Sequence, residues 1–145
     1  MHPSPLLGPI VALVAWSLVM MVWLYVARLP AMRRAGTDFA ALRGTTSGDI
    51  ARIVPPEVQW KTHNYMHLME QPTIFYAIVT ALILMGFDAA INVWLAWAYV
   101  GLRVAHSLVQ ATTNVVRLRF ILFLLASLCL ASLTIHAALY LLHHG

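Results

Sequence analysis

The chain alternates between long apolar runs and shorter polar segments, and the apolar runs have the length of membrane spans. Each of four runs approaches the ~20 residues with which an α-helix crosses the hydrocarbon of a bilayer. The first and the last run contain no charged residue. The pattern predicts one all-α domain over residues 1–145, built as a bundle of four transmembrane helices. These helices are expected at about residues 6–27, 61–87, 89–115 and 119–142.

Breaker residues separate the first two predicted helices. Pro30 is expected to end the first helix, because proline has no backbone N–H to donate and its ring crowds the preceding turn. The segment over residues 28–60 is too polar to span a membrane and holds several glycines and a pair of prolines. It is therefore predicted to be a cytoplasmic loop, with a short helix near residues 49–54. Within the second helix, Pro72 predicts a kink.

Composition and charge define the class of protein further. Hydrophobic residues make up 61% of the chain and charged residues 10%, against about 25% charged in soluble domains. The basic residues lie mostly between the first two and the last two helices, so the positive-inside rule places both termini on the non-cytoplasmic side. No aromatic interleaving accompanies them, and nucleic-acid binding is not expected. The first helix lacks a basic leader and a cleavage site, and it is expected to be retained. The single cysteine, Cys129, excludes a disulfide within the chain.

Two stripes of polar residues cross the apolar background at helical spacing, one in the second helix and one in the third. Each contains an ionisable residue, which is costly in hydrocarbon unless it is paired or faces water. We therefore expect Glu70 and Arg103 to be neighbours, within one chain or across a subunit boundary. The two stripes are expected to face a shared cavity that opens toward the cytoplasm. They comprise Asn64, His67 and Glu70, and Arg103, His106, Gln110 and Asn114.

The residues around these stripes resemble the MAPEG family, the membrane-associated proteins in eicosanoid and glutathione metabolism. The resemblance rests on His63 to Tyr76, which reads HNYMHLMEQPTIFY, and on Arg103 to Ser107, which reads RVAHS. It covers essentially the whole chain, and the EQPTIFY form is similar to an uncharacterised bacterial branch. The resemblance implies a multi-pass protein of the bacterial inner membrane that forms a homotrimer among membrane lipids. It also implies that glutathione binds between adjacent subunits near the cytoplasmic side.

Matched motif to motif, the resemblance implies roles for individual residues. Arg119 would be the catalytic arginine that activates the thiol, and Arg103 a structural arginine that meets the acid. Asn64 and Glu70 would be the asparagine and acidic ligands, although the acid more commonly stands three residues after the asparagine, where this chain has His67. The remaining residues expected to bind glutathione are Arg33 or Arg34, Lys61, His67, His106 and Gln110.

Three departures from the family bear on function. Gln110 stands where glutathione-using members commonly have a tyrosine, and Phe120 and Phe123 stand where the prostaglandin synthase has a serine and a tyrosine. Prostaglandin synthesis is therefore not expected. Our first interpretation is a glutathione-dependent transferase or peroxidase that acts on lipophilic electrophiles. The alternative is a non-catalytic protein that binds a lipid or another lipophile, and a third class is a proton or ion pathway along the buried charges.

Some polar residues also have purely structural interpretations. Asn64, His67 and His106 are equally well explained as interhelical hydrogen-bond partners that hold the bundle together. His63 and His67 have the i, i+4 spacing of zinc ligands, but no cysteine or acidic pair nearby completes a tetrahedral set, so no metal site is expected. His136, alone in an apolar helix, is predicted to be a packing residue.

Overall fold

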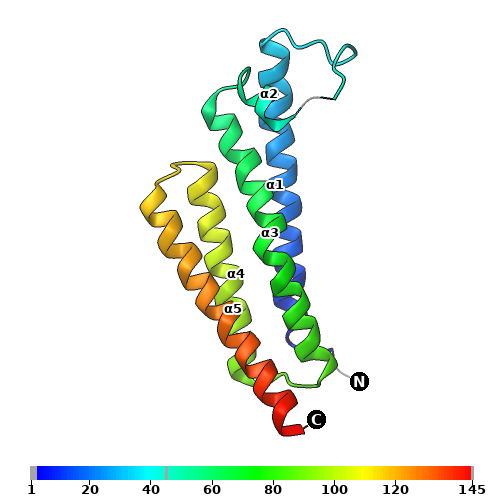
Figure 1. Cartoon of the computed structure of the whole chain (residues 1–145), viewed down its shortest axis with the longest axis vertical. Helices are drawn as coiled ribbons and strands as arrows, with labels where there is room; N and C mark the ends of the chain where they lie inside the picture. The colour runs from blue at the N-terminus through cyan, green and yellow to red at the C-terminus, as the bar shows by residue number, and fades with distance from the viewer. Residues whose placement is uncertain (1–2, 45, 145) are drawn as a thin grey trace.

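The protein is a bundle of four long helices with one short helix in a connecting loop. The computed structural model describes residues 3–44 and 46–144. In Figure 1, α1 and α3 run side by side, α4 and α5 form a second pair, and both termini lie at the end of the bundle opposite α2. The helices are α1 (Leu7–Arg34), α2 (Ser47–Ala51), α3 (Pro56–Leu84), α4 (Ala90–Ala111) and α5 (Val116–His144).

The first helix is longer than the sequence predicts, because α1 continues through Pro30 to Arg34. Pro30 is an exposed residue of the helix and lines an open hollow rather than a packed contact. The carbonyl that loses its donor, that of Val26, also belongs to an exposed residue. Beyond the proline, Met32 is buried and packs the last turn against the rest of the molecule. The cost of the proline is therefore small at this position.

The predicted loop contains more helix than expected. Besides the end of α1, it includes α2 at residues 47–51, slightly before the predicted 49–54, and the first turn of α3. Thr46 and Asp49 form a capping box at the start of α2: Asp49 N–H donates to Thr46 Oγ1 at 3.3 Å, and Thr46 N–H donates to Asp49 Oδ2 at 3.0 Å. The Thr46 hydroxyl also donates to Asp49 Oδ2, at 2.7 Å, and this bond together with the one from Thr46 N–H holds the pKa of the Asp49 carboxyl below its ordinary value.

The third helix begins at Pro56, in the first helical position, where the missing N–H costs nothing. It continues through the buried Pro72 to Leu84. Gly86 then adopts a left-handed conformation with φ 65°, which glycine adopts without strain and which ends the helix. The structure thus shows one uninterrupted α3, with the proline between its polar and apolar halves.

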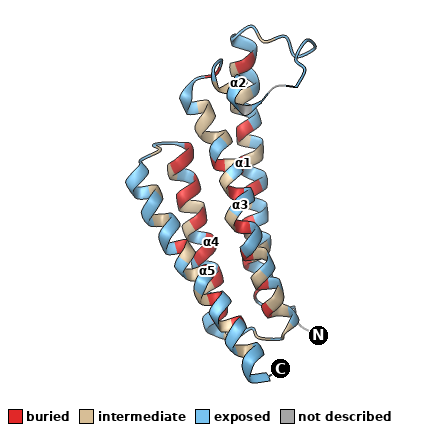
Figure 2. Ribbon diagram, viewed as in Figure 1, coloured by how far each residue is buried: buried red, intermediate tan, exposed pale blue. Residues whose placement is uncertain are grey.

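The surface of the bundle is apolar and its interior is partly polar. Figure 2 shows buried residues along α4, whereas α5 is largely exposed. Trp94 is 73% exposed on α4, while Arg103 on the same helix is only 1% exposed. Such an inverted arrangement suits a hydrocarbon environment, in which polar groups turn inward. Within the part of the chain that the structure describes, three helices are long and apolar enough to cross a membrane: α1, α3 and α5.

One aromatic stack and two side-chain hydrogen bonds join α3 to its neighbours. The rings of Phe75 and Tyr99 are stacked with centroids 4.3 Å apart, and neither residue is exposed. Tyr99 also donates its hydroxyl proton to Gln71 Oε1 at 3.3 Å, and Gln71 Nε2 donates to Ser127 Oγ at 2.8 Å. This chain of contacts ties α3 to both α4 and α5, and it fixes the side of α3 that carries the polar stripe.

Candidate functional site

Three polar side chains predicted from the sequence lie around one pocket of about 250 Å³. His67 comes from α3, His106 from α4 and Arg119 from α5, so the pocket exists only where these helices meet. The rest of its lining is apolar: Val116, Phe120 and Phe123. One residue from each predicted polar stripe, His67 on α3 and His106 on α4, therefore lines the pocket, against an apolar wall supplied by α5.

Arg119 is held in place by the turn between α4 and α5. Its Nη1 donates to Asn114 Oδ1 at 2.6 Å, and its buried Nε has no partner among the described residues. Asn114 has a φ of 51°, a left-handed conformation that asparagine tolerates better than most residues. Its backbone N–H donates to Val109 O at 2.7 Å, which closes the end of α4. Asn114 was predicted to continue the polar stripe of the helix; it instead ends the helix and orients the arginine.

Arg103 is the largest fully buried side chain, and only one of its donors is used. Its Nη2 donates to the backbone carbonyl of His67 at 2.7 Å. Its guanidinium lies 6.0 Å from the ring centroid of Phe123 on the pocket wall. Nε and Nη1 have no hydrogen-bond partner among the described residues. A buried cation with free donors is costly, so this guanidinium has capacity to bind an additional acceptor.

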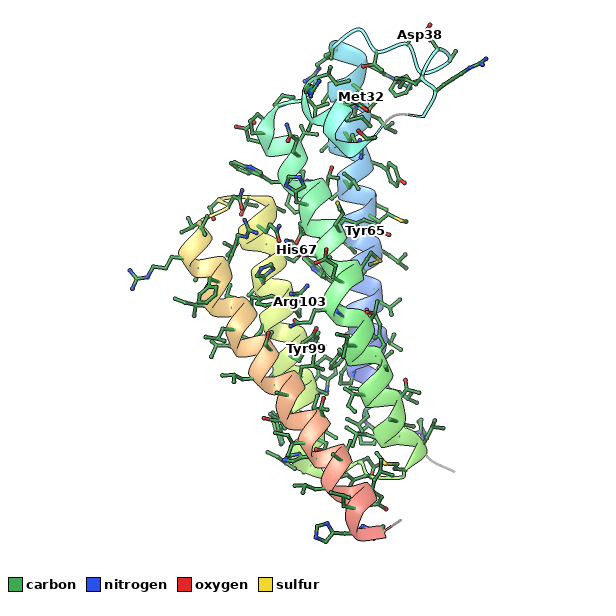
Figure 3. The ribbon with its side chains drawn as sticks, viewed as in Figure 1. Met32, Asp38, Tyr65, His67, Tyr99 and Arg103 are labelled. Carbon is green, nitrogen blue, oxygen red and sulfur yellow. The ribbon has the colours of Figure 1, made fainter. Side chains whose placement is uncertain are left out.

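The expected ion pair between Glu70 and Arg103 does not form within the chain. Instead, Glu70 Oε2 lies 2.9 Å from His67 Nδ1, the only salt-bridge contact among the residues that the structure describes. Helical side chains point back toward the N-terminus, so Glu70 reaches the preceding turn of its own helix rather than across to α4. Arg103 contacts the same residue through its carbonyl, so His67 links the two charges. Figure 3 shows His67, Arg103 and Tyr99 in descending order between α3 and α4.

Asn64 and Gln110 are fully buried beside the pocket without lining it. Asn64 Nδ2 donates to Ser107 Oγ at 2.8 Å, which joins α3 to α4, while Asn64 Oδ1 has no partner among the described residues. Gln110 Oε1 is likewise without a partner in the described part of the chain. Both amides thus combine a structural position with an unused acceptor.

The predicted basic ligands outside the stripes lie apart from the pocket. Lys61 Nζ donates to the carbonyls of Glu57, at 2.9 Å, and Ala111, at 3.2 Å, and lies 5.3 Å from the Trp23 ring centroid. It therefore caps the C-terminal end of α4, where a cation is favourable. Two separate hollows near the end of α1 are lined by Arg33 and by Arg34, respectively.

Sequence reasoning gave Ser107 no role in this site, and it did not predict the contacts that Asn114 and Phe123 make. Asn114 orients Arg119, Ser107 anchors Asn64, and Phe123 forms the wall next to Arg103. The sequence signal for Ser107 was present, because it directly follows His106 and lies four residues after Arg103, on the same face of the helix. The role of Asn114 depends on a turn that helical spacing alone does not indicate.

A model of the MAPEG family matches residues 6–139. The chain belongs to the MAPEG family. No curated protein and no solved structure was found to match it. The three helices of spanning length and the family together identify an integral membrane protein. MAPEG members generally use glutathione, so the family also indicates a glutathione-related function.

The donors and acceptors around this MAPEG pocket suit glutathione as a co-substrate. Glutathione carries two carboxylates, one ammonium, one thiol and several amides. The free N–H groups of Arg103 and Arg119 match carboxylates or a thiolate, and the free oxygens of Asn64 and Gln110 match an ammonium or amide. No group of three His, Cys, Asp or Glu that could hold a metal ion occurs within residues 3–44 and 46–144.

Proposed function

We propose that this protein is a membrane-embedded glutathione transferase or peroxidase that acts on lipophilic electrophiles. The observation that carries the proposal is the convergence of His67, His106 and Arg119 on one pocket, beside a buried Arg103 with free donors. Polar donors and an apolar wall meet there, as a thiol tripeptide and a lipophilic second substrate require.

Arg119 is the residue to which we assign thiol activation. A free thiol has a pKa of ~8.5 and is only a few per cent ionised at neutral pH, whereas a neighbouring arginine lowers such a pKa by ~1 to 3 units. Arg119 lines the pocket, and Asn114 fixes its guanidinium while leaving Nε free. The guanidinium is therefore pre-oriented toward a sulfur in the pocket, and the thiolate is the nucleophile that forms a bond to the electrophile.

The lipophilic second substrate is expected to bind against the apolar wall of the pocket. Phe120 is 64% exposed and Phe123 39% exposed on the outer surface of α5. In a bilayer these rings would contact lipid on one side and the pocket on the other. A lipophilic electrophile could therefore enter sideways from the membrane, without crossing water.

The proposal includes an assembly and an orientation. We infer a homotrimer in which four helices of each subunit, α4 included, cross the bacterial inner membrane, with both termini on the non-cytoplasmic side. The buried polar face of α4 and the exposed apolar surface of α5 are consistent with further burial between subunits. In such a trimer, Lys61 and Arg33 or Arg34 could complete the site from a neighbouring subunit.

A non-catalytic lipophile binder is the second candidate. It is favoured by the apolar half of the pocket lining and by Gln110, which is buried behind the pocket where a tyrosine would be expected. Such a protein would bind a lipid in the same pocket, and its arginine would serve only to hold a carboxylate.

Titration and turnover of the reconstituted protein separate these candidates. The full-length protein in lipid nanodiscs is titrated calorimetrically with glutathione, and conjugation of glutathione to an aromatic halide is then measured. We expect binding in the millimolar range or tighter, and glutathione-dependent turnover. Binding of a fatty acid without any thiol-dependent turnover would favour the binder instead, and absence of glutathione binding would refute the transferase.

Arg117 offers a matched control for the assigned arginine. It lies two residues before Arg119, is exposed and does not line the pocket. Arg119→Ala should lower turnover by ~10²-fold, the usual effect of removing one preorganised donor at a developing charge. Arg117→Ala removes the same charge and should leave turnover unchanged. Wild-type turnover by Arg119→Ala would remove this residue from the mechanism.

A further inference from the structure

The contact between His67 and Glu70 has the geometry of an oriented base. The two residues are three apart on α3, and Glu70 Oε2 lies 2.9 Å from His67 Nδ1. A carboxylate can only accept a hydrogen bond, so the imidazole must present its proton on Nδ1. The other ring nitrogen, Nε2, is then the lone-pair nitrogen, and it is free to accept a proton.

The surroundings of His67 place this imidazole at the pocket. His67 lines the pocket together with Arg119, and its ring lies edge-on to that of His106, with centroids 6.2 Å apart. Its backbone carbonyl is held by Arg103 at 2.7 Å. Arg103 thus holds the backbone of His67 and Glu70 holds its ring, while the side chain stays 40% exposed.

We propose that the His67–Glu70 pair is the catalytic base of this site, which takes the thiol proton during addition of glutathione to a lipophilic activated alkene. The inference rests on the proposed glutathione function. It assigns His67 the chemistry and Glu70 the positioning. Arg119 then stabilises the sulfur charge rather than removing the proton, so the two residues have separable roles.

The step balances without any further reactant. His67 Nε2 accepts the S–H proton, and the sulfur lone pair forms a bond to the β-carbon of an α,β-unsaturated carbonyl compound. The π electrons of the alkene move to the α-carbon and its carbonyl. The imidazolium of His67 then returns the proton to the α-carbon, which yields a thioether and restores the neutral imidazole.

The charges near His67 explain why the carboxylate is needed. The Arg103 guanidinium on α4 contacts the backbone carbonyl of His67, the His106 ring lies edge-on to the imidazole, and Arg119 on α5 lines the same pocket, whereas Glu70 is the acidic group in contact with the imidazole. A proton taken up beside two guanidinium groups is opposed by their charge. Glu70 offsets that charge and stabilises the imidazolium, as an acid does in a histidine-based hydrolase.

The test compares His67→Gln with a matched histidine on the same helix. His63 lies one turn earlier, is exposed and does not line the pocket, so His63→Gln should behave as wild type. Addition of glutathione to an activated alkene is measured across pH in nanodiscs, together with glutathione affinity. His67→Gln should lower turnover by ~10²-fold near pH 7, and the loss should shrink toward pH 9, because the thiol ionises unaided above its pKa of ~8.5.

A second readout does not depend on turnover. The ultraviolet absorbance of the thiolate that develops when glutathione binds should fall in His67→Gln at neutral pH, while affinity stays within about threefold, a change worth less than ~1 kcal/mol. Glu70→Gln should give an intermediate loss. A loss of turnover that is equal at every pH, or unchanged thiolate absorbance, would refute His67 as the catalytic base. Neither result would contradict the proposed glutathione function. No binding and no turnover by the wild type would overturn both.

Discussion

Two buried polar clusters on α4 differ in how fully their hydrogen bonds are satisfied. Near the start of the helix, Asn92 Oδ1 lies 2.7 Å from His136 Nδ1, and Asn92 Nδ2 donates to Phe87 O at 3.1 Å. Both ends of this amide are used. About three helical turns further along α4, the guanidinium of Arg103 and the neighbouring Gln110 retain donors and an acceptor without partners among the described residues. The first cluster is complete within one chain, and the second is not.

The difference separates a structural contact from a binding site. Polar groups that satisfy each other between membrane helices stabilise packing by about 0.6 kcal/mol on average. A buried polar group left without a partner costs ~1 to 3 kcal/mol, more if it is charged. A protein that retains such groups next to a pocket recovers this cost when a ligand or another subunit supplies the missing partners. The Arg103 cluster is therefore consistent with a ligand-binding site, and the Asn92 cluster with a structural contact between α4 and α5.

Removing the Arg103 guanidinium should have the largest effect on glutathione binding among the changes considered. Arg103→Met keeps an unbranched apolar side chain, shorter than that of arginine, and removes the free donors. Glutathione affinity should fall about 30-fold, equivalent to ~2 kcal/mol for hydrogen bonds from a charged group. The melting temperature should hold or rise, because replacing a buried charge by an apolar residue is often neutral or stabilising. Calorimetric titration and thermal unfolding in the same detergent measure the two quantities.

The opposite result would give the arginine a different partner. A lower melting temperature with unchanged affinity would mean that the free donors of Arg103 are satisfied by another subunit rather than by glutathione. The Glu70 carboxylate of a neighbouring subunit would then be the first candidate, since the ion pair across a subunit boundary is the part of the sequence prediction that a single chain leaves open.

Most of the fold follows from the sequence because the lengths of the apolar runs are imposed by the thickness of a bilayer. The all-helical class and the positions of α3 to α5 needed little more than hydropathy and breakers. The extension of α1 past Pro30 could not be predicted, because the penalty of a proline depends on whether its ring faces solvent or a neighbour. That orientation emerges only when Met32 is packed against the bundle.

A disruption of the satisfied cluster should affect stability and spare binding. Asn92→Leu leaves the His136 imidazole without its partner, and we expect the free energy of unfolding to fall by ~1 kcal/mol, near the upper values for hydrogen bonds between membrane helices. Glutathione affinity should stay unchanged, because neither residue lines the His67 pocket. Denaturation in mixed micelles and the same titration measure both effects.

A double variant of Asn92 and His136 tests whether the two side chains depend on each other. Asn92→Leu combined with His136→Leu should restore part of the lost stability, because an apolar pair leaves no unsatisfied polar group. Losses that simply add would show that the two side chains do not depend on each other, and the proposed contrast with the Arg103 cluster would fail.

The site was predictable only where helical spacing determines it. The recurrence of polar residues every three or four positions brought His67 and His106 to one pocket. Within one chain Glu70 contacts His67 rather than Arg103, because the spacing fixes a face, whereas the tilt of helical side chains toward the N-terminus decides which partner on that face is reached. Asn114 was misjudged for a related reason. The helical spacing of polar residues continues in the sequence beyond Ala111, but α4 ends at that residue and the chain turns.

The smallest predicted effect concerns this turn, because Asn114 acts on the pocket only through Arg119. Asn114→Gly retains the left-handed conformation and loses the acceptor, whereas Asn114→Ala loses both. We expect glutathione turnover to fall about three- to tenfold in Asn114→Gly. This is the effect of losing roughly one hydrogen bond to a charged group when water partly replaces the lost partner. Asn114→Ala should show the same loss of turnover with a lower melting temperature besides. Equal turnover in wild type and Asn114→Gly would mean that Arg119 is oriented by the pocket's occupant rather than by the turn.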